Sequence, residues 1–249
     1  MRNSHLAAIS VSTFVSKGSR PAQEDHILCD QEKNIFIVAD GFGGPVPGST
    51  ASKMACEAVR TFLFKEAGDL EATLPFHLRS YFSLPGNVLF NAFIHANRKL
   101  TAHNKGKNVH ECGGASVIAG FMDGDLLAIA NAGVCTAWLY REGKAIELVA
   151  PRSYAKLCDP FLLEALAENQ VPLMALGLVP DLEPEIFEVR LRSGDWVVFA
   201  TDGVSPRVMS QISGIKQTNS TPKAVGSEFT EMLKKEEFKD NCALSLVIF

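Results

Sequence analysis

Three aspartates in this sequence lie at the ends of apolar segments. Asp40 follows the run Ile-Phe-Ile-Val-Ala and is followed by Gly41, and Asp202 follows Val-Val-Phe-Ala-Thr and is followed by Gly203. Asp240 lies just before the apolar C-terminal segment. An apolar run that stops at an acidic residue and a glycine turn predicts a buried strand with its carboxylate at the rim of a sheet.

A fourth acidic position, the pair Glu24-Asp25, precedes another short apolar segment, and Arg20 lies just before this pair. Any one Asp-Gly is also an ordinary turn dipeptide, but the repetition suggests that these carboxylates converge on one rim. Clustered carboxylates repel one another unless cations lie between them, and such hard oxygen ligands prefer Mg²⁺ or Mn²⁺. Two ions of this kind can activate a water and hold a phosphoryl group, whose oxygens Arg20 could bind in a bidentate fork.

The bulk composition describes an ordinary soluble globular protein. The net charge is −4 and the pI is about 5.9, which argues against nucleic acid as a partner. No run of 18 apolar residues occurs, so no membrane span is expected and a cytoplasmic location is predicted. The six cysteines form no C-x-x-C pair and are interpreted as reduced thiols that mostly fill the core.

Hydrophobic periodicity gives the elements that must position the acidic residues. Alternating or continuous apolar runs predict strands at 6–15, 26–29, 34–40, 115–122, 126–132, 135–140, 145–149, 186–191, 196–201 and 243–249. Apolar residues at three- and four-residue spacings predict helices at about 49–67, 87–103, 159–170 and 222–237. Helices and hairpin-rich segments that are segregated along the chain indicate an α+β protein in one domain, residues 1–249, with two stacked antiparallel sheets flanked by helices.

In their order along the chain, these segments resemble the metal-dependent, type 2C-like serine/threonine protein phosphatases of bacterial type. The resemblance rests on four motifs, with the family's pattern after each: Gly18-Ser-Arg20-Pro-Ala-Gln-Glu24-Asp25 (Gly-x-Arg-x-x-Asn-Glu-Asp), Asp40-Gly41-Phe42-Gly43-Gly44 (Asp-Gly-His/Met-Gly-Gly), Ser193-Gly-Asp195 with Thr201-Asp202-Gly203 (Gly-Asp with Ser/Thr-Asp-Gly) and Asp240-Asn241 (Asp-Asn). Together they extend from near residue 16 to the C-terminus.

The resemblance implies an αββα sandwich with two Mn²⁺ or Mg²⁺ ions between the sheets. In that arrangement Asp40 bridges both ions, and Asp202 and Asp240 bind one of them. Glu24 and the Gly41 carbonyl serve the other, directly or through water. Arg20 holds the substrate phosphate, and Asp25 and Asn241 orient the ligands.

The activity that the resemblance implies is hydrolysis of phosphoserine and phosphothreonine by direct attack of a metal-activated water. The substrate would be a phosphorylated protein, the target of a serine/threonine kinase in a signalling pathway. Two departures stand out. Phe42 replaces the usual His or Met and cannot transfer a proton. Val134 replaces an aspartate that helps to hold a third metal ion, which argues against a third site.

Two alternative functions are considered. Residues 43–50 nearly match a phosphate-binding P-loop, but Ser49 replaces the lysine and two prolines remove N–H donors that the loop would use. The other alternative is a catalytically weak or inactive regulatory module that binds phosphopeptides on the same fold. Val134 favours this alternative, whereas the retention of Asp40, Asp202 and Asp240 favours an enzyme.

Overall fold

Two five-stranded antiparallel sheets form the centre of the computed structural model, which describes residues 6–66, 78–158, 170–215 and 221–249. The first sheet has the order β1-β10-β9-β6-β7, formed by Ser10–Ser16, Cys242–Ile248, Trp196–Ala200, Thr136–Arg141 and Lys144–Val149. The second sheet has the order β2-β3-β4-β5-β8, formed by His26–Asp30, Ile35–Phe42, Gly114–Asp123, Leu126–Ala132 and Glu185–Arg190.

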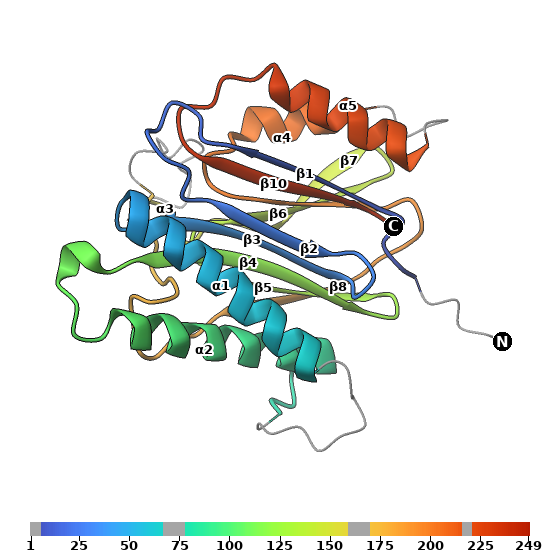
Figure 1. Cartoon of the computed structure of the whole chain (residues 1–249). Helices are drawn as coiled ribbons and strands as arrows, with labels where there is room; N and C mark the ends of the chain where they lie inside the picture. Colours follow the sequence, from blue (N-terminus) through green and yellow to red (C-terminus); the bar gives the residue numbers. More distant parts are fainter. Residues whose placement is uncertain (1–5, 67–77, 159–169, 216–220) are drawn as a thin grey trace.

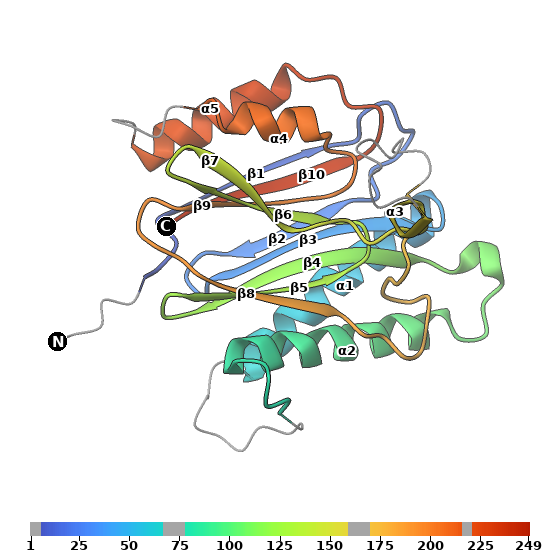
Figure 2. The same ribbon diagram turned by 180° about the vertical axis from the view of Figure 1, so that it is seen from behind.

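Helices cover the outer face of each sheet (Figures 1 and 2). Helices α1 (Pro45–Glu66) and α2 (Leu84–Asn104) pack on the second sheet, and α4 (Pro206–Ile212) and α5 (Pro222–Lys234) pack on the first. Two short helical segments, η1 (Val109–Glu111) and α3 (Tyr154–Cys158), lie in the connections. The result is the predicted four-layer αββα sandwich, and the α+β prediction is confirmed.

Strand β3 shows how the sequence builds these layers. Ile35, Ile37 and Ala39 contribute to the core beneath α1 and α2, whereas Phe36 and Val38 contribute to the core between the two sheets. The alternation follows from the two-residue period of a strand. Because both faces of β3 are covered, its sequence is a continuous apolar run.

Most predicted elements are present, with shifted ends. Strand β3 continues two residues past Asp40 because Gly41 and Phe42 pair with β4. Helix α1 begins at Pro45 and not near residue 49, since prolines in a first helical turn give up only N–H groups that have no partner there. Residues 45–50 are therefore helical and do not form an open P-loop. The predicted helix 159–170 lies almost entirely outside the described residues, and α4 was not predicted.

Two smaller expectations can also be compared with the structure. All six cysteines are free, as predicted, although Cys158 is exposed and does not fill the core. Among the described residues, no helix combines the length and the apolar character needed to cross a membrane.

The packing between the sheets generates a test of the fold. The rings of Phe36 and Phe199 stack between the sheets with centroids 6.2 Å apart, and both side chains are fully buried. We expect Phe199→Ala to lower the free energy of unfolding by about 3–5 kcal/mol, because it leaves a cavity between the sheets. Urea unfolding measures this loss. Ile146→Ala, at a side chain that is 44% exposed, is the control and should cost much less; equal losses would contradict the assignment of this core.

Candidate metal centre

Strand alternation brings two of the predicted acidic positions, Asp25 and Asp40, to one end of the space between the sheets. Asp40 has the same parity as Phe36 and Val38, which face the opposite sheet. Asp25 has the parity of Ile27 on the neighbouring strand, whose side chain packs against the same core. Asp25 and Asp40 therefore meet because each lies at the end of a strand with the parity of the inner face. Asp202 and Asp240 follow the parity of the outer face of the first sheet, but they lie close enough for their charges to raise the pKa of both groups.

The first sheet supplies the facing positions by the same rule. Thr201 follows β9 with the parity of Phe199, and Asn241 precedes β10 with the parity of Ala243. The Thr201 hydroxyl accepts from the Ala243 N–H at 2.9 Å and donates to Asp25 Oδ2 at 2.8 Å. This bond spans the two sheets directly beside the carboxylate cluster.

Asn241 anchors the segment that carries Glu24. Its Oδ1 accepts from the Glu24 N–H at 2.7 Å, and its Nδ2 donates to the carbonyls of Lys17 and Ala22 at 2.9 and 2.8 Å. The side chain is buried, so three of its hydrogen-bonding positions are used to fix the loop before β2. Asn241 therefore fixes the backbone of the loop that carries Glu24, and its role in orienting metal ligands stays a prediction.

Asp25 is a buried carboxyl group with an unsatisfied oxygen. Its Oδ2 accepts from Thr201. Its Oδ1 has no N–H or hydroxyl donor among the described atoms, and the Asp40 carboxyl group lies close enough to share a proton with Asp25. Burial raises the pKa of Asp25 to about 7, and the neighbouring Asp202 and Asp240 carboxylates add to the increase against the opposing bond from Thr201. A buried, unsatisfied carboxyl oxygen of this kind is well suited to a cation or to a water bound to one.

The pKa values of Asp40 and Asp202 are also raised. Burial and then the charges of Asp202 and Asp25 raise the pKa of Asp40 well above its ordinary range. Burial and the Asp240 charge raise the pKa of Asp202 to about 7, although the N–H groups of Asp202 and Gly203 donate to its carboxylate. Ionised together, these groups repel one another, and a bound cation would relieve the repulsion.

Glu24 and the glycine turn after Asp40 form the other side of the site. The Gly41 N–H donates to the Glu24 carbonyl at 3.2 Å. A Cβ on Gly41 would collide with the carbonyls of Gly48 and Glu24, and a Cβ on Gly48 would collide with the Glu24 carboxylate. Glycine at both positions therefore lets the turn approach Glu24 closely, which sets the Gly41 backbone beside a carboxylate.

Arg20 and Asp240, which were assigned separate roles, form a bidentate ion pair. Arg20 Nε donates to Asp240 Oδ1 at 2.7 Å, and Arg20 Nη2 donates to Oδ2 at 2.5 Å. The Arg20 side chain is 51% exposed and that of Asp240 is 25% exposed. The pair places a guanidinium at the outer edge of the carboxylate cluster, where a phosphate would approach.

The donor types in this cluster suit Mg²⁺ or Mn²⁺, because all of them are carboxylate or carbonyl oxygens. In the described part of the chain, however, no three or more His, Cys, Asp or Glu side chains are arranged as a metal-ion site. Both Asp240 oxygens bond to Arg20, so Asp240 could act as a ligand only by sharing or exchanging this partner. The oxygen donors of the cluster and the Asp25 Oδ1 atom fit the predicted ions. For Asp240 to bind an ion, its carboxylate would have to turn away from Arg20.

Two positions that depart from the family pattern are accommodated by packing. Phe42 lies against Gly114, where a Cβ would collide with the phenyl ring. Val134 is buried, with 1% of its surface exposed, so this position offers no oxygen to an ion.

The residue after Val134, Cys135, is a buried thiol whose pKa is raised by burial and by the charges of Asp40 and Asp202. Sequence reasoning did not place Cys135 beside the cluster, because a lone cysteine in an apolar strand carries no such signal.

A cleft of about 440 Å³ opens beside Asp202 and Asp240. It extends away from the carboxylates over a partly apolar floor, and its lining carries both signs of charge. The charged and aromatic members that the sequence did not single out are Trp138, Glu147, Lys156, Arg207, Glu236, Glu237, Phe238 and Lys239. A volume of this size is typical of a ligand-binding cleft.

Solved structures share this fold along nearly the whole chain. The PPM Ser-Thr phosphatase MsPP from Mycobacterium smegmatis, in complex with cacodylate, is 19% identical, with 98% of this chain and 100% of that one covered and a TM-score of 0.73. The catalytic domain of the serine/threonine phosphatase PstP, in complex with two manganese ions, is 17% identical, with coverages of 98% and 100% and a TM-score of 0.75. The serine/threonine phosphatase of S. agalactiae is 20% identical, with coverages of 96% and 98% and a TM-score of 0.74.

No family model and no curated protein matches the sequence. At identities of 17–20%, the structural likeness establishes the fold of this chain, which is that of the bacterial serine/threonine phosphatases. The resemblance inferred from the four motifs is confirmed at this level.

The carboxylate cluster predicts an unusual pH dependence of stability. The folded-state pKa values of Asp25 and Asp202 are about 7, above their ordinary 3.8, so the folded state holds more protons than the unfolded state between these values. In EDTA we therefore expect the stability to fall as the pH rises from about 4 through 7. Asp202→Asn should flatten this fall and raise the melting temperature at pH 8, as measured by thermal unfolding. The control Asp181→Asn, at an exposed residue, should change neither; a parallel fall in the Asp202→Asn protein would contradict the prediction.

Proposed function

We propose that this protein is a Mn²⁺- or Mg²⁺-dependent protein serine/threonine phosphatase of bacterial type, which acts in the cytoplasm as one domain over residues 1–249. One observation carries the proposal. Asp25, Asp40, Asp202 and Asp240 converge between the sheets of a fold shared with serine/threonine phosphatases, and three of the four have a raised pKa. Such a cluster is costly to the fold unless it serves a cation.

Asp40, Asp202, Asp240, Glu24 and the Gly41 carbonyl would hold the two ions. When bound, the ions would supply an activated water and neutralise charge on the phosphoryl group during in-line displacement. Asp25 and Asn241 would orient the ligand-bearing segments through Thr201 and the Glu24 N–H. No covalent enzyme intermediate is needed, and no nucleophilic side chain is proposed.

Arg20 would bind the substrate phosphate. Its guanidinium already binds one carboxylate in a bidentate manner, and a phosphate presents two oxygens to the same fork. A phosphate that replaced Asp240 at Arg20 would at the same time release Asp240 toward the other carboxylates. We therefore propose that Arg20 and Asp240 exchange partners when ions and substrate bind.

The cleft beside Asp202 and Asp240 would receive the protein chain that carries the phosphate. Trp138 and Met209 contribute apolar surface, and Lys156 and Arg207 contribute positive charge beside the acidic Glu147. Apolar and charged walls together could receive both kinds of side chain that flank a phosphorylated residue in a peptide. A phosphoprotein that is the target of a serine/threonine kinase is accordingly the proposed substrate.

A second candidate function is a weakly active or inactive module that binds phosphopeptides. The burial of Val134 and the Arg20–Asp240 pair favour it, because one position lacks a ligand and the other holds its carboxylate away from an ion. Such a module would retain phosphopeptide binding without turnover.

An activity assay tests the proposed function. We expect hydrolysis of a phosphothreonine peptide in the presence of Mn²⁺ and its loss in EDTA, because the carboxylates cannot activate water on their own. Asp202→Asn and Asp40→Asn should each reduce kcat/KM by at least ~100-fold. Release of inorganic phosphate provides the measurement, and Asp181→Asn is the exposed control. Activity that survives EDTA would contradict the proposal, and phosphopeptide binding without turnover under any divalent ion would favour the second candidate.

A further test concerns Arg20. Arg20→Ala should raise the KM for the phosphopeptide about tenfold or more, because the bidentate contact with phosphate is lost. Its melting temperature should change little, since an exposed ion pair contributes about 0–1 kcal/mol. Lys17→Ala removes a nearby exposed cation and leaves its carbonyl in place for Asn241, so it should resemble the wild type. An unchanged KM in Arg20→Ala would remove Arg20 from the substrate site.

A further inference from the structure

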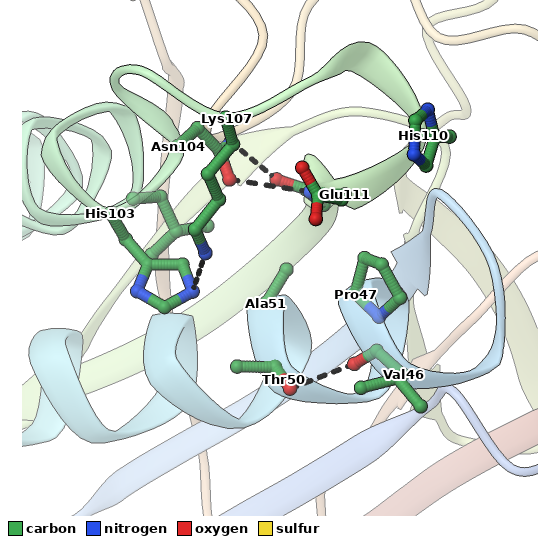
Figure 3. A pocket seen from close by; sticks show the side chains of 11 residues that line it. Val46, Pro47, Thr50, Ala51, His103, Asn104, Lys107, His110 and Glu111 are labelled. Atoms are coloured by element: carbon green, nitrogen blue, oxygen red, sulfur yellow. Dashed lines mark hydrogen bonds between the residues drawn. The ribbon is translucent and has the colours of Figure 1, made fainter.

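A second cavity lies apart from the carboxylate cluster, between the first turns of α1 and the last turn of α2 (Figure 3). Its volume is about 420 Å³. One wall is formed by Val46, Pro47 and Ala51 of α1, and Leu100 of α2 lines it from the other side. The segment after α2, which ends at Gly113, closes the third side. The interior is therefore mostly apolar.

Three basic side chains, those of His103, Lys107 and His110, line the edge of the cavity. His103 and Lys107 line the cavity, and Lys107 Nζ donates to His103 Nε2 at 2.7 Å (Figure 3). His110 lines it from the following segment. Glu111 is the one acidic residue of the lining, and its Oε2 already accepts from the N–H and the Nδ2 of Asn108.

The surrounding sequence strengthens this positive character. Residues 98–110 contain Arg98, Lys99, Lys105 and Lys107, all exposed, and no aspartate or glutamate. The chain as a whole carries a net charge of −4, so this segment differs in sign from the rest of the molecule. A basic surface attracts a partner that carries acidic residues, and this charge complementarity favours an acidic occupant.

Two exposed valines indicate that the occupant is a protein segment. Val46, at the rim of the cavity, is 76% exposed, and Val109, in the segment after α2, is 91% exposed. Both branched side chains are exposed to solvent. A small ligand held inside the cavity would leave them exposed. A peptide would cover them while placing an apolar side chain inside.

We propose that this cavity is a docking site for an acidic peptide segment of a protein partner, which inserts an apolar side chain between α1 and α2 and places carboxylates against Lys107 and its basic neighbours. The site is separate from the phosphate-binding machinery and does not depend on the proposed activity. Its walls nevertheless adjoin the turn after Asp40. A Cβ on Gly113 would collide with the Pro47 carbonyl, and a Cβ on Gly43 would collide with the Cys112 carbonyl. A partner docked here would therefore rest on the segment that leads from Asp40 into α1.

A binding experiment tests the docking site directly. The probe is a fluorescein-labelled peptide, Glu-Asp-Glu-Leu-Leu-Glu-Asp-Glu, titrated with the full chain and followed by fluorescence anisotropy at two salt concentrations. We expect saturable binding that weakens with salt. Lys107→Glu should weaken it by at least about tenfold, because it reverses the charge at the rim. Val46→Asp, at an exposed position that can carry an acid in the first helical turn, should also weaken it.

The controls separate docking from general attraction between charges. Lys144→Glu makes the same charge change on exposed β7 and should bind the peptide as the wild type does. A peptide with glycines in place of both leucines should bind much more weakly. The proposal would be overturned by the absence of saturable binding, by equal losses in Lys107→Glu and Lys144→Glu, or by equal binding of the glycine peptide. Binding of octanoate alone, without the peptide, would replace the protein partner by a small organic anion and would overturn it as well.

Discussion

The repulsion among carboxylates buried between two sheets is the interaction on which the rest of this structure depends. Asp25 is buried and Asp40 and Asp202 are half-buried at their surfaces; burial raises the pKa of all three groups first, and the neighbouring carboxylates raise it further. A fold would not keep this arrangement for stability, since replacing such groups by apolar residues is often neutral or stabilising. The unfavourable electrostatics of the cluster are what the proposed function would explain, because a bound cation would offset them.

Packing between and outside the sheets, together with hydrogen bonds, holds these carboxylates in place. Sheets on both sides of the cluster are held by the stacked phenyl rings of Phe36 and Phe199, and outer helices bury the opposite faces. Thr201 and Asn241 then fix the loops by hydrogen bonds whose donors and acceptors come from both ends of the chain. Positions separated by more than 200 residues, such as Glu24 and Asn241, are thereby held in contact. A loosely packed sandwich would let the carboxylates move apart into water.

Much of the fold and of the site could be predicted from the sequence, because both follow from strand periodicity. The runs that end at Asp40 and Asp202 are apolar on both faces, and this requires covered sheets with acidic ends. The pairing of Arg20 with Asp240 could not be predicted, since it depends on how two distant loops meet. The same holds for Cys135 beside Asp40, which lies in an apolar stretch without any motif. The start of α1 at Pro45 differs from the predicted start near residue 49, because a first helical turn accepts prolines.

The segment from Asp40 to the first turn of α1 serves two surfaces at once. On one side, Gly41 has no room for a Cβ beside the carbonyls of Gly48 and Glu24, and a Cβ on Gly48 would displace the Glu24 carboxylate. On the other side, Pro47 and Gly113 meet in the wall of the apolar cavity, where Gly113 likewise has no room for a Cβ. Packed interiors deform little, so a shift of this wall must be passed on to neighbouring atoms. The same few residues contact both the cavity wall and the Glu24 backbone, so a partner docked in the cavity would press on the turn that carries Gly41.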